Sequence, residues 1–332
     1  MFWRHALAAH ALAATAAALA FTTAIPAAEA RTVTVATVYG ARDVSTQAME
    51  KWGELLAKKT DGRLTINIIP GGTLGGDREL LQQLSSGEID VDLSSPVVMQ
   101  YVAPQYQCLE AEYIYENENQ GFKVWRGEIG KEASAAMQKQ YGIEIAAVGR
   151  RGGRVVTANK KIIEPQDMTG LKFRVTNDLR AQVFAAYGAQ PAPLPLSELY
   201  GALRQGVFDG EENPLSTIYS LRFHEVQPFI SLTYHVWTYN LVLVNSAFYD
   251  GLGDDRKAFD ETLSQALDWL YDAVAKDDAR IIAEIKKSGK TEIVEPDVAA
   301  FRAKARPVLK AYADKNCKPG LIDQVDQISS AN

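Results

Sequence analysis

Two arginines stand in stretches that otherwise have the pattern of buried β-strands. In GLKFRVTND (170–178), apolar and polar residues alternate, and Arg174 takes one of the polar positions. Such alternation is typical of a strand. Twenty residues earlier, Arg154 begins RVVTAN, which also has the composition of a strand. A guanidinium is a planar, permanently charged fork of donors that matches the two oxygens of a carboxylate. The two strands therefore predict a site for an acidic ligand.

Each arginine also has a structural alternative. Arg174 could form an internal salt bridge with one of the acidic residues at the next predicted turn, which are Asp209, Glu211 and Glu212. Arg154 could lie at the surface beside a glycine pair. If Arg174 is buried between two closed lobes without an anion, its unpaired charge destabilises the closed form by roughly several kcal/mol. An empty protein should therefore stay open, and a ligand closes it through its higher affinity for the closed form.

The sequence gives little support for a phosphate-binding, dinucleotide-binding or zinc site. SGKT (288–291) lacks the glycine that a phosphate-binding loop needs five residues before Gly289, and GLG (251–253) lacks the third glycine of a dinucleotide site. A zinc site would have to combine histidines and cysteines that are far apart, and we expect His235 to be a hydrogen-bonded histidine of the core or pocket wall. We therefore expect no metal, no cofactor and no catalytic residues.

Strands and helices alternate along the first third of the chain. The patterns predict strands at 32–38, 63–69 and 89–95, with a helix at 43–59 and a short helix ended by Gly87 between them. This order favours a mainly parallel, right-handed α/β sheet.

The middle of the chain continues in the same style. We expect a strand at 143–148, then the two strands that carry Arg154 and Arg174, and helices at 179–187 and 197–206. Because proline is favoured at the first position of a helix, Pro214 predicts a helix start, with Asn213 as its N-cap.

One predicted helix is unusually long. Residues 254–288 contain a helical stripe of apolar residues and neither proline nor glycine. At 1.5 Å per residue it would reach about 50 Å, well beyond the ~30 Å diameter of a small lobe. We expect it to run along both lobes. The alternative, a coiled-coil dimer helix, is disfavoured because the spacing drifts and Asp277–Asp278 interrupts the stripe.

The first thirty residues have the features of a secretory signal peptide. A basic start is followed by an alanine-rich apolar stretch and by Ala28-Glu29-Ala30, which predicts cleavage after Ala30 and a mature chain of 302 residues, 332 less 30. About 300 residues favour two lobes, which we place at 31–151 with 239–280 and at 152–238 with 281–332. The net charge of −6 argues against nucleic-acid binding. We expect an exported, soluble monomer.

The sequence does not decide whether its two cysteines are bonded to each other. Cys108 and Cys317 form one disulfide if they are close, since an oxidising compartment permits it, and are two buried thiols otherwise.

Four segments, in this order, give the chain a resemblance to a known family. They are PGGTLGGDRELLQQLSSGEIDV (70–91), DMTGLKFRV (167–175), ELYGALRQGVFDGEENP (198–214) and FHEVQPFISLTYH (223–235). Together they resemble the DctP-like solute-binding proteins of tripartite ATP-independent periplasmic (TRAP) transporters. The resemblance implies a periplasmic-binding-protein-like fold with two α/β lobes, a hinged cleft and a long helix across both.

The resemblance also implies roles for particular residues. The arginine of GLKFRV, Arg174, would bind the carboxylate of the ligand, and Arg154 would assist. The other positions that the family uses around its ligands are Asn213, Asn177, Asp77 and Ser95. Two aromatic residues, Tyr39 and Trp237, are further candidates for the wall of the cleft. Ser95 is not the acidic residue of sialic acid binders, which puts that ligand in doubt, and the two aromatic residues could equally belong to the core.

The resulting hypothesis is a periplasmic subunit that captures a small organic acid and delivers it to a permease. The family implies small and large integral-membrane permease subunits driven by an ion gradient. Two alternatives stay open, namely the ligand-binding subunit of a periplasmic sensor and a periplasmic enzyme acting on organic acids. The sequence does not choose among C4-dicarboxylates, sugar acids, keto acids and aromatic acids.

Overall fold

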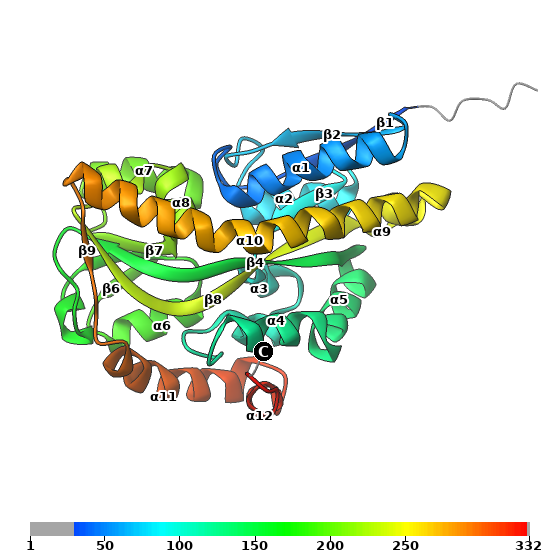
Figure 1. The fold of residues 1–332 in the computed structure, drawn as a ribbon. Coiled ribbons are helices and arrows are strands. Elements are labelled where there is room, and N and C mark those ends of the chain that lie inside the picture. The colour runs from blue at the N-terminus through cyan, green and yellow to red at the C-terminus, as the bar shows by residue number, and fades with distance from the viewer. Residues whose placement is uncertain (1–29, 331–332) are drawn as a thin grey trace, which may run out of the picture.

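The computed structural model describes residues 30–330, which form a mixed α/β fold around one nine-stranded sheet (Figure 1). The predicted signal peptide, apart from Ala30, lies outside the described residues. The strand order is β2-β1-β3-β8-β4-β7-β5-β6, with β9 paired to β8. The strands are β1 (Arg31–Ala36), β2 (Leu64–Ile69), β3 (Val91–Ser94), β4 (Ile143–Ala158), β5 (Lys172–Val175), β6 (Gln190–Pro193), β7 (Gly210–Pro214), β8 (Phe229–Asn245) and β9 (Glu292–Val294).

Helices cover the sheet and join its strands. The α-helices are α1 (Val44–Lys59), α2 (Asp77–Ser86), α3 (Met99–Val102), α4 (Glu118–Arg126), α5 (Glu128–Tyr141), α6 (Asp178–Ala186), α7 (Leu196–Arg204), α8 (Leu215–Ser220), α9 (Ser246–Asp250), α10 (Arg256–Ser288), α11 (Val298–Asn316) and α12 (Leu321–Asp326). The 3₁₀ turns are η1 (Pro96–Val98), η2 (Pro104–Glu110), η3 (Pro165–Met168), η4 (Phe223–Glu225) and η5 (Gly253–Asp255).

Two long antiparallel strands, β4 and β8, run through the whole sheet. Residues 143–149 of β4 pair with 240–245 of β8 beside β3, and residues 154–158 pair with β7 on one side and with 229–236 of β8 on the other. We call the β1-β2-β3 side the first half of the sheet and the β5-β6-β7 side the second half. The two strands therefore connect the halves.

The continuity of β4 corrects one expectation. We predicted a strand at 143–148 and a separate strand at Arg154, but the structure has a single 16-residue strand. Three register shifts against β8, one of them between Arg150 and Gly152, absorb the irregular glycine-rich stretch without ending the ladder. The expected mainly parallel sheet is likewise mixed, because both long strands pair antiparallel.

The predicted long helix is present as α10, with 33 residues. Its first part packs Phe259 edge-on against Trp52 of α1, with ring centroids 4.7 Å apart, in the larger apolar core. Its last part places Ile281 and Ile285 in a second core beneath α7 and α8. Figure 1 shows α10 along one side of the sheet and α11 on the opposite side. The helix thus contributes to the cores of both halves.

Cys108 and Cys317 form a disulfide, which answers the question that the sequence left open. The bond has an Sγ–Sγ distance of 1.99 Å and joins η2 to the residue that follows α11. Nearby, the Lys318 amide donates to the carbonyl of Gln105 at 2.8 Å. The end of α11 is therefore attached to the side of the molecule that carries η2.

Replacing both cysteines by serine is expected to lower the free energy of unfolding by roughly 2–4 kcal/mol, because the bond closes a loop of 209 residues in the unfolded chain. Urea unfolding of the two proteins measures the difference. A reducing agent should destabilise the wild-type protein and leave the double variant unchanged. Equal unfolding midpoints for the oxidised wild type and the double variant would contradict this expectation.

No helix within residues 30–330 combines the length and the apolar character needed to span a membrane.

Candidate functional site

Arg174 is a buried arginine whose guanidinium is only partly engaged. It lies in β5 and is 3% exposed. Its Nε donates to the carbonyl of Leu194 at 2.8 Å, whereas Nη1 is buried without a hydrogen-bond partner. Among the described residues it forms no ion pair, so the salt bridge considered as an alternative is not formed. Burial lowers the pKa of Arg174, although Glu212 and Glu211 act in the opposite direction. The residue holds a donor for an acceptor that the protein does not supply.

Arg154, in contrast, is held firmly by the neighbouring strand. Its Nε donates to Oε2 of Glu212 at 2.5 Å, and its Nη2 donates to the Glu212 carbonyl at 2.7 Å and to Oδ1 of Asn213 at 3.2 Å. The pairing of β4 with β7, in which Arg154 lies opposite Pro214, places these groups side by side. Arg154 is 5% exposed, so the alternative of a surface position is excluded.

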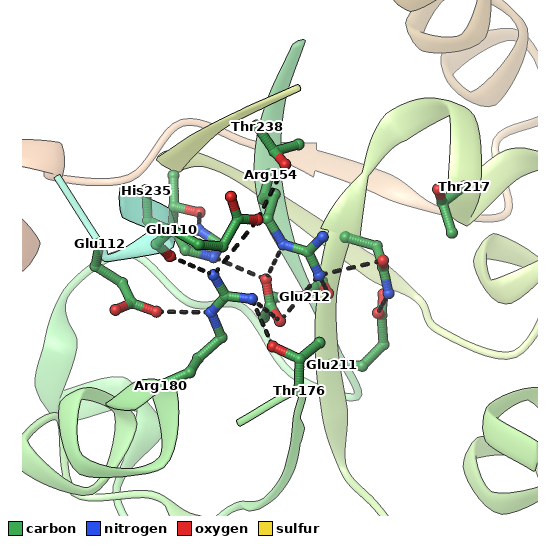
Figure 2. A network of polar contacts seen from close by, with 12 residues as sticks. Glu110, Glu112, Arg154, Thr176, Arg180, Glu211, Glu212, Thr217, His235 and Thr238 are labelled. Atoms are coloured by element: carbon green, nitrogen blue, oxygen red, sulfur yellow. Dashed lines mark hydrogen bonds and ion pairs between the residues drawn. The ribbon is translucent and has the colours of Figure 1, made fainter. Parts of the chain in front are cut away.

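Glu212 is the centre of a buried polar network that the sequence did not reveal (Figure 2). Besides Arg154, it accepts hydrogen bonds from Nη1 of Arg180 at 3.3 Å, and Nε2 of His235 lies 3.1 Å from its carboxylate. Burial alone would raise the pKa of Glu212, but Arg154 and Arg180 hold it well below its usual range. The carboxylate therefore stays ionised and orients both arginines.

Arg180 connects this centre to a more distant segment. It donates from Nε to Oε1 of Glu112 at 2.8 Å and from Nη2 to the carbonyl of Glu110 at 2.9 Å. Figure 2 shows Arg180 between these glutamates and Glu212. The roles of Arg180 and Glu112 are not apparent from local sequence patterns, because the contact joins residues 68 positions apart. From the sequence, Glu212 was considered only as one of three possible partners of Arg174.

Asn213 differs from its predicted local structure. It lies inside β7, and α8 begins only at Leu215 with Pro214 in the capping position, so Asn213 is not an N-cap. The proline instead ends the strand, which the helix-start pattern did not distinguish. The Asn213 side chain accepts from Arg154 and donates from Nδ2 to Oε2 of Glu211 at 2.5 Å. Strand pairing, and not a helix start, therefore places Asn213 beside Arg154.

Asp77 interacts electrostatically, through its carboxyl group, with Arg174 and Arg154. It begins α2 and is partly exposed. Burial raises the pKa of Asp77 to about 6, and Arg174 and Arg154 oppose this rise. Because α2 follows β2, in the first half of the sheet, whereas Arg174 lies in β5, in the second half, the site draws on both halves.

Tyr39 adds a buried polar atom without a partner on the side of Asp77, and Ser95 lies near it. Tyr39 is 5% exposed and its hydroxyl has no hydrogen-bond partner. Burial raises the pKa of Tyr39, Asp77 acts in the same direction, and the nearby Ser95 hydroxyl lowers it. Asp92 in β3 also has a buried Oδ2 without a partner. This side of the site thus offers hydroxyl and carboxyl groups to a ligand.

The structure gives Asn177 and Trp237 other neighbours. Asn177 is the N-cap of α6, where its side chain accepts from the amide of Arg180 at 2.8 Å. Trp237 stacks on Tyr234, with ring centroids 5.8 Å apart, beside Gly153. Among the contacts described for residues 30–330, none joins Trp237 to Arg174 or Asp77. Their predicted contacts with a ligand stay predictions.

The arrangement of these groups can bind an anion. Arg174 presents a buried donor, and burial also raises the pKa of Glu211, which is hydrogen-bonded to Asn213 and Thr157. His235 is held between Glu212 and the Thr233 hydroxyl, as expected for a hydrogen-bonded core histidine. In the part of the chain that the structure describes, no three His, Cys, Asp or Glu side chains are grouped to hold a metal ion.

Three surface hollows lie away from this cluster. The first, of about 720 Å³, lies between α5, β4 and α10, the second lies between α11 and α12, and the third lies beside α1 and α10. None of the three is lined by Arg174 or Arg154. The candidate site is therefore identified by its buried polar atoms without partners.

The free energy of unfolding is expected to fall as the pH rises from about 5 to about 8. Burial raises the pKa of Glu110 to about 7 and that of Glu211 to about 7, from 4.5. Between the usual pKa of 4.5 and the raised pKa of about 7, these carboxyl groups are protonated in the folded state and ionised in the unfolded state. The folded state therefore binds more protons, and a rise in pH destabilises the fold. One pKa unit corresponds to about 1.4 kcal/mol, and we expect a fall of at least about that size.

Urea unfolding at several pH values measures this dependence. Glu211→Gln, which cannot ionise, should make the decrease smaller. A free energy of unfolding that rises over the same pH range would contradict the burial of these carboxyl groups as the source of the effect.

Comparison with known proteins adds an independent line of evidence. Residues 35–316 match the family model of DctP, described as "Bacterial extracellular solute-binding protein, family 7". The chain is 30% identical, over 76% of its length and 78% of the relative, to the 2,3-diketo-L-gulonate-binding periplasmic protein YiaO of Escherichia coli (strain K12).

Two solved structures are similar over nearly the whole chain. A TRAP periplasmic solute-binding protein from Roseobacter denitrificans with bound L-galactonate has a TM-score of 0.83 and 27% identity, and covers 91% of this chain and 99% of its own. Another, from Sulfurospirillum deleyianum with bound succinate, has a TM-score of 0.84 and 27% identity, with coverage of 90% and 99%.

Proposed function

Because the chain belongs to the DctP family, family 7 of the bacterial extracellular solute-binding proteins, we propose that it captures a small organic acid through Arg174 and delivers it to a TRAP permease. Family membership is shown by the match over residues 35–316, and relatives of this chain bind sugar acids and other carboxylates. The pairing of Arg174 with a carboxylate and the delivery step are the proposal.

The main support for this proposal is the unpaired donor of Arg174. Arg174 is a buried, charged side chain whose Nη1 lacks a partner and which has no ion pair among the described residues. Buried charges in proteins are normally paired, and an unpaired one is costly. A bound carboxylate would supply the missing acceptor in a charge-assisted hydrogen bond. Arg154, held by Glu212, would add a second positive charge.

The proposed partners and location follow from the family. A TRAP solute-binding protein acts with small and large integral-membrane permease subunits, so we infer the same partners here. The curated relative YiaO is a periplasmic protein, which supports a periplasmic location. Cleavage of a signal peptide after Ala30 remains our prediction from the sequence, as does a monomeric state.

We further propose that the molecule divides into the two lobes predicted from the sequence, 31–151 with 239–280 and 152–238 with 281–332. The passage of β4 and β8 from one half of the sheet to the other near these boundaries supports the division. A ligand held between Asp77 and Arg174 would then contact both lobes. The alternative roles, as a sensor subunit or an enzyme, have no observation that favours them over transport.

A thermal-shift screen of an organic-acid library tests the proposal. A ligand present at one hundred times its Kd stabilises the folded state by about 2.7 kcal/mol, which is readily detected. The screen should include L-galactonate, succinate and 2,3-diketo-L-gulonate, with the corresponding uncharged amides as controls. We expect at least one acid, and no amide, to raise the melting temperature. Stabilisation by neutral compounds alone would overturn the proposal.

A further inference from the structure

Arg151 is a second buried arginine, and it differs from Arg174 in that both of its terminal nitrogens have hydrogen-bond partners. It lies in β4, is 2% exposed, and sits at the register shift between Arg150 and Gly152. Gly152 adopts a φ of +90°, which a residue with a side chain rarely adopts, and this marks an irregular backbone where the two halves of the sheet meet.

The guanidinium of Arg151 joins the start of α1 to α8. Its Nη2 donates to Oδ2 of Asp43 at 2.9 Å and to Oγ1 of Thr217 at 2.7 Å, and its Nη1 donates to Oγ of Ser45 at 2.6 Å. The Thr217 hydroxyl lies 3.3 Å from the same Asp43 oxygen and donates to it. Helix α1 covers the first half of the sheet, and α8 follows β7 in the second half. The group therefore bridges the halves.

The same guanidinium supports a residue of the candidate site. Cζ of Arg151 lies 3.5 Å from the centroid of the Tyr39 ring, within the range of a cation–π contact. Tyr39 presents a buried hydroxyl without a hydrogen-bond partner on the side of Asp77 and Ser95. Asp43 and Ser45 hold Arg151 in place, so the position of the Tyr39 ring depends on the bridge.

We propose that Arg151 is a positioning residue that fixes Tyr39 in the ligand site and couples its placement to the junction of α1 and α8. This inference rests on the proposed function for the ligand, but the bridge itself exists without one. A buried charge with all its partners is costly to disrupt, because removing one member leaves the others unpaired. Loss of the bridge should therefore loosen both of the segments that it joins.

Hydrogen exchange on the protein without ligand tests the bridge. Arg151→Met should speed exchange at least tenfold in residues 39–45 and also in residues 215–221. Thr217→Val removes only the two hydrogen bonds of this hydroxyl, with Arg151 and with Asp43, and keeps the arginine with Asp43. It therefore guards against a failure of the first variant to fold. It should speed exchange in both segments as well, although less.

The neighbouring arginine provides a matched control. Arg150 lies in the same strand but pairs with Glu118 at 2.9 Å and stacks between Phe122 and Tyr271. Arg150→Met should leave exchange in residues 39–45 and 215–221 unchanged. If Arg151→Met and Thr217→Val speed exchange in one segment alone, or in neither, the bridge is refuted.

A second measurement tests whether Arg151 acts through Tyr39. Calorimetry with L-galactonate and with succinate compares Tyr39→Phe, Arg151→Met and the double variant. If Arg151 positions the Tyr39 hydroxyl, the double variant should lose no more affinity than the weaker-binding single variant. Additive losses would overturn the positioning role. If the wild type binds neither acid, this assay bears on the proposed function, and hydrogen exchange still decides the bridge.

Discussion

Replacing Arg174 by alanine is expected to weaken binding of the acid by about a thousandfold while the protein stays folded. Truncating one partner of a buried, charged hydrogen bond costs roughly 2–5 kcal/mol or more, and about 4 kcal/mol corresponds to a thousandfold change in Kd. Arg174 makes no ion pair among the described residues, so its removal leaves no carboxylate of the protein without a partner. The free energy of unfolding of the empty protein should therefore stay equal or rise.

Calorimetry with an acid that binds the wild type, together with urea unfolding, measures both parts of this expectation. Arg174→Lys should also bind poorly, because a point charge does not reproduce the fork of a guanidinium. Lys172→Ala is a matched control, since Lys172 is an exposed cation in the same strand. Equal affinities for the wild type and Arg174→Ala would remove Arg174 from the site.

Replacing Glu212 by glutamine is expected to have the largest effect on stability, a loss of about 3–5 kcal/mol. Glu212 is fully buried and is the shared acceptor of Arg154, Arg180 and His235. An amide cannot neutralise two guanidinium groups, so both would remain buried with too little negative charge. We expect the affinity for the acid to fall as well, because Arg154 loses the group that orients it.

Urea unfolding of Glu212→Gln against the wild type measures the stability loss. The control is Glu225→Gln, which breaks an exposed pair with Arg222 and should change stability little. Unfolding midpoints that coincide for Glu212→Gln and the wild type would show that the network does not stabilise the fold.

Local sequence patterns were sufficient for some parts of this molecule. The alternation around Arg174 predicted β5, and the long stripe without helix-breaking residues predicted α10. Both signals are local, since strand and helix periodicity depend on neighbouring residues. The assignment of Arg174 to the carboxylate of a ligand came from this pattern and from the family resemblance, and it stays a prediction.

Other parts depend on contacts that a local pattern does not contain. Asn213 was predicted as a helix cap, because Pro214 fits a helix start as well as a strand end, and only pairing with β4 decides between them. The contact of Arg180 with Glu112 and that of Arg151 with Asp43 span 68 and 108 positions. Such pairs come together through the order of strands in the sheet, which the sequence did not specify.

The most direct test of the account is a crystal structure of the protein with an acid that the thermal-shift screen identifies. We predict that the carboxylate of this acid lies within hydrogen-bond distance of Nη1 of Arg174, with Arg154 beside it. A bound acid whose carboxylate lies elsewhere, with the Arg174 guanidinium facing solvent or only groups of the protein, would contradict it.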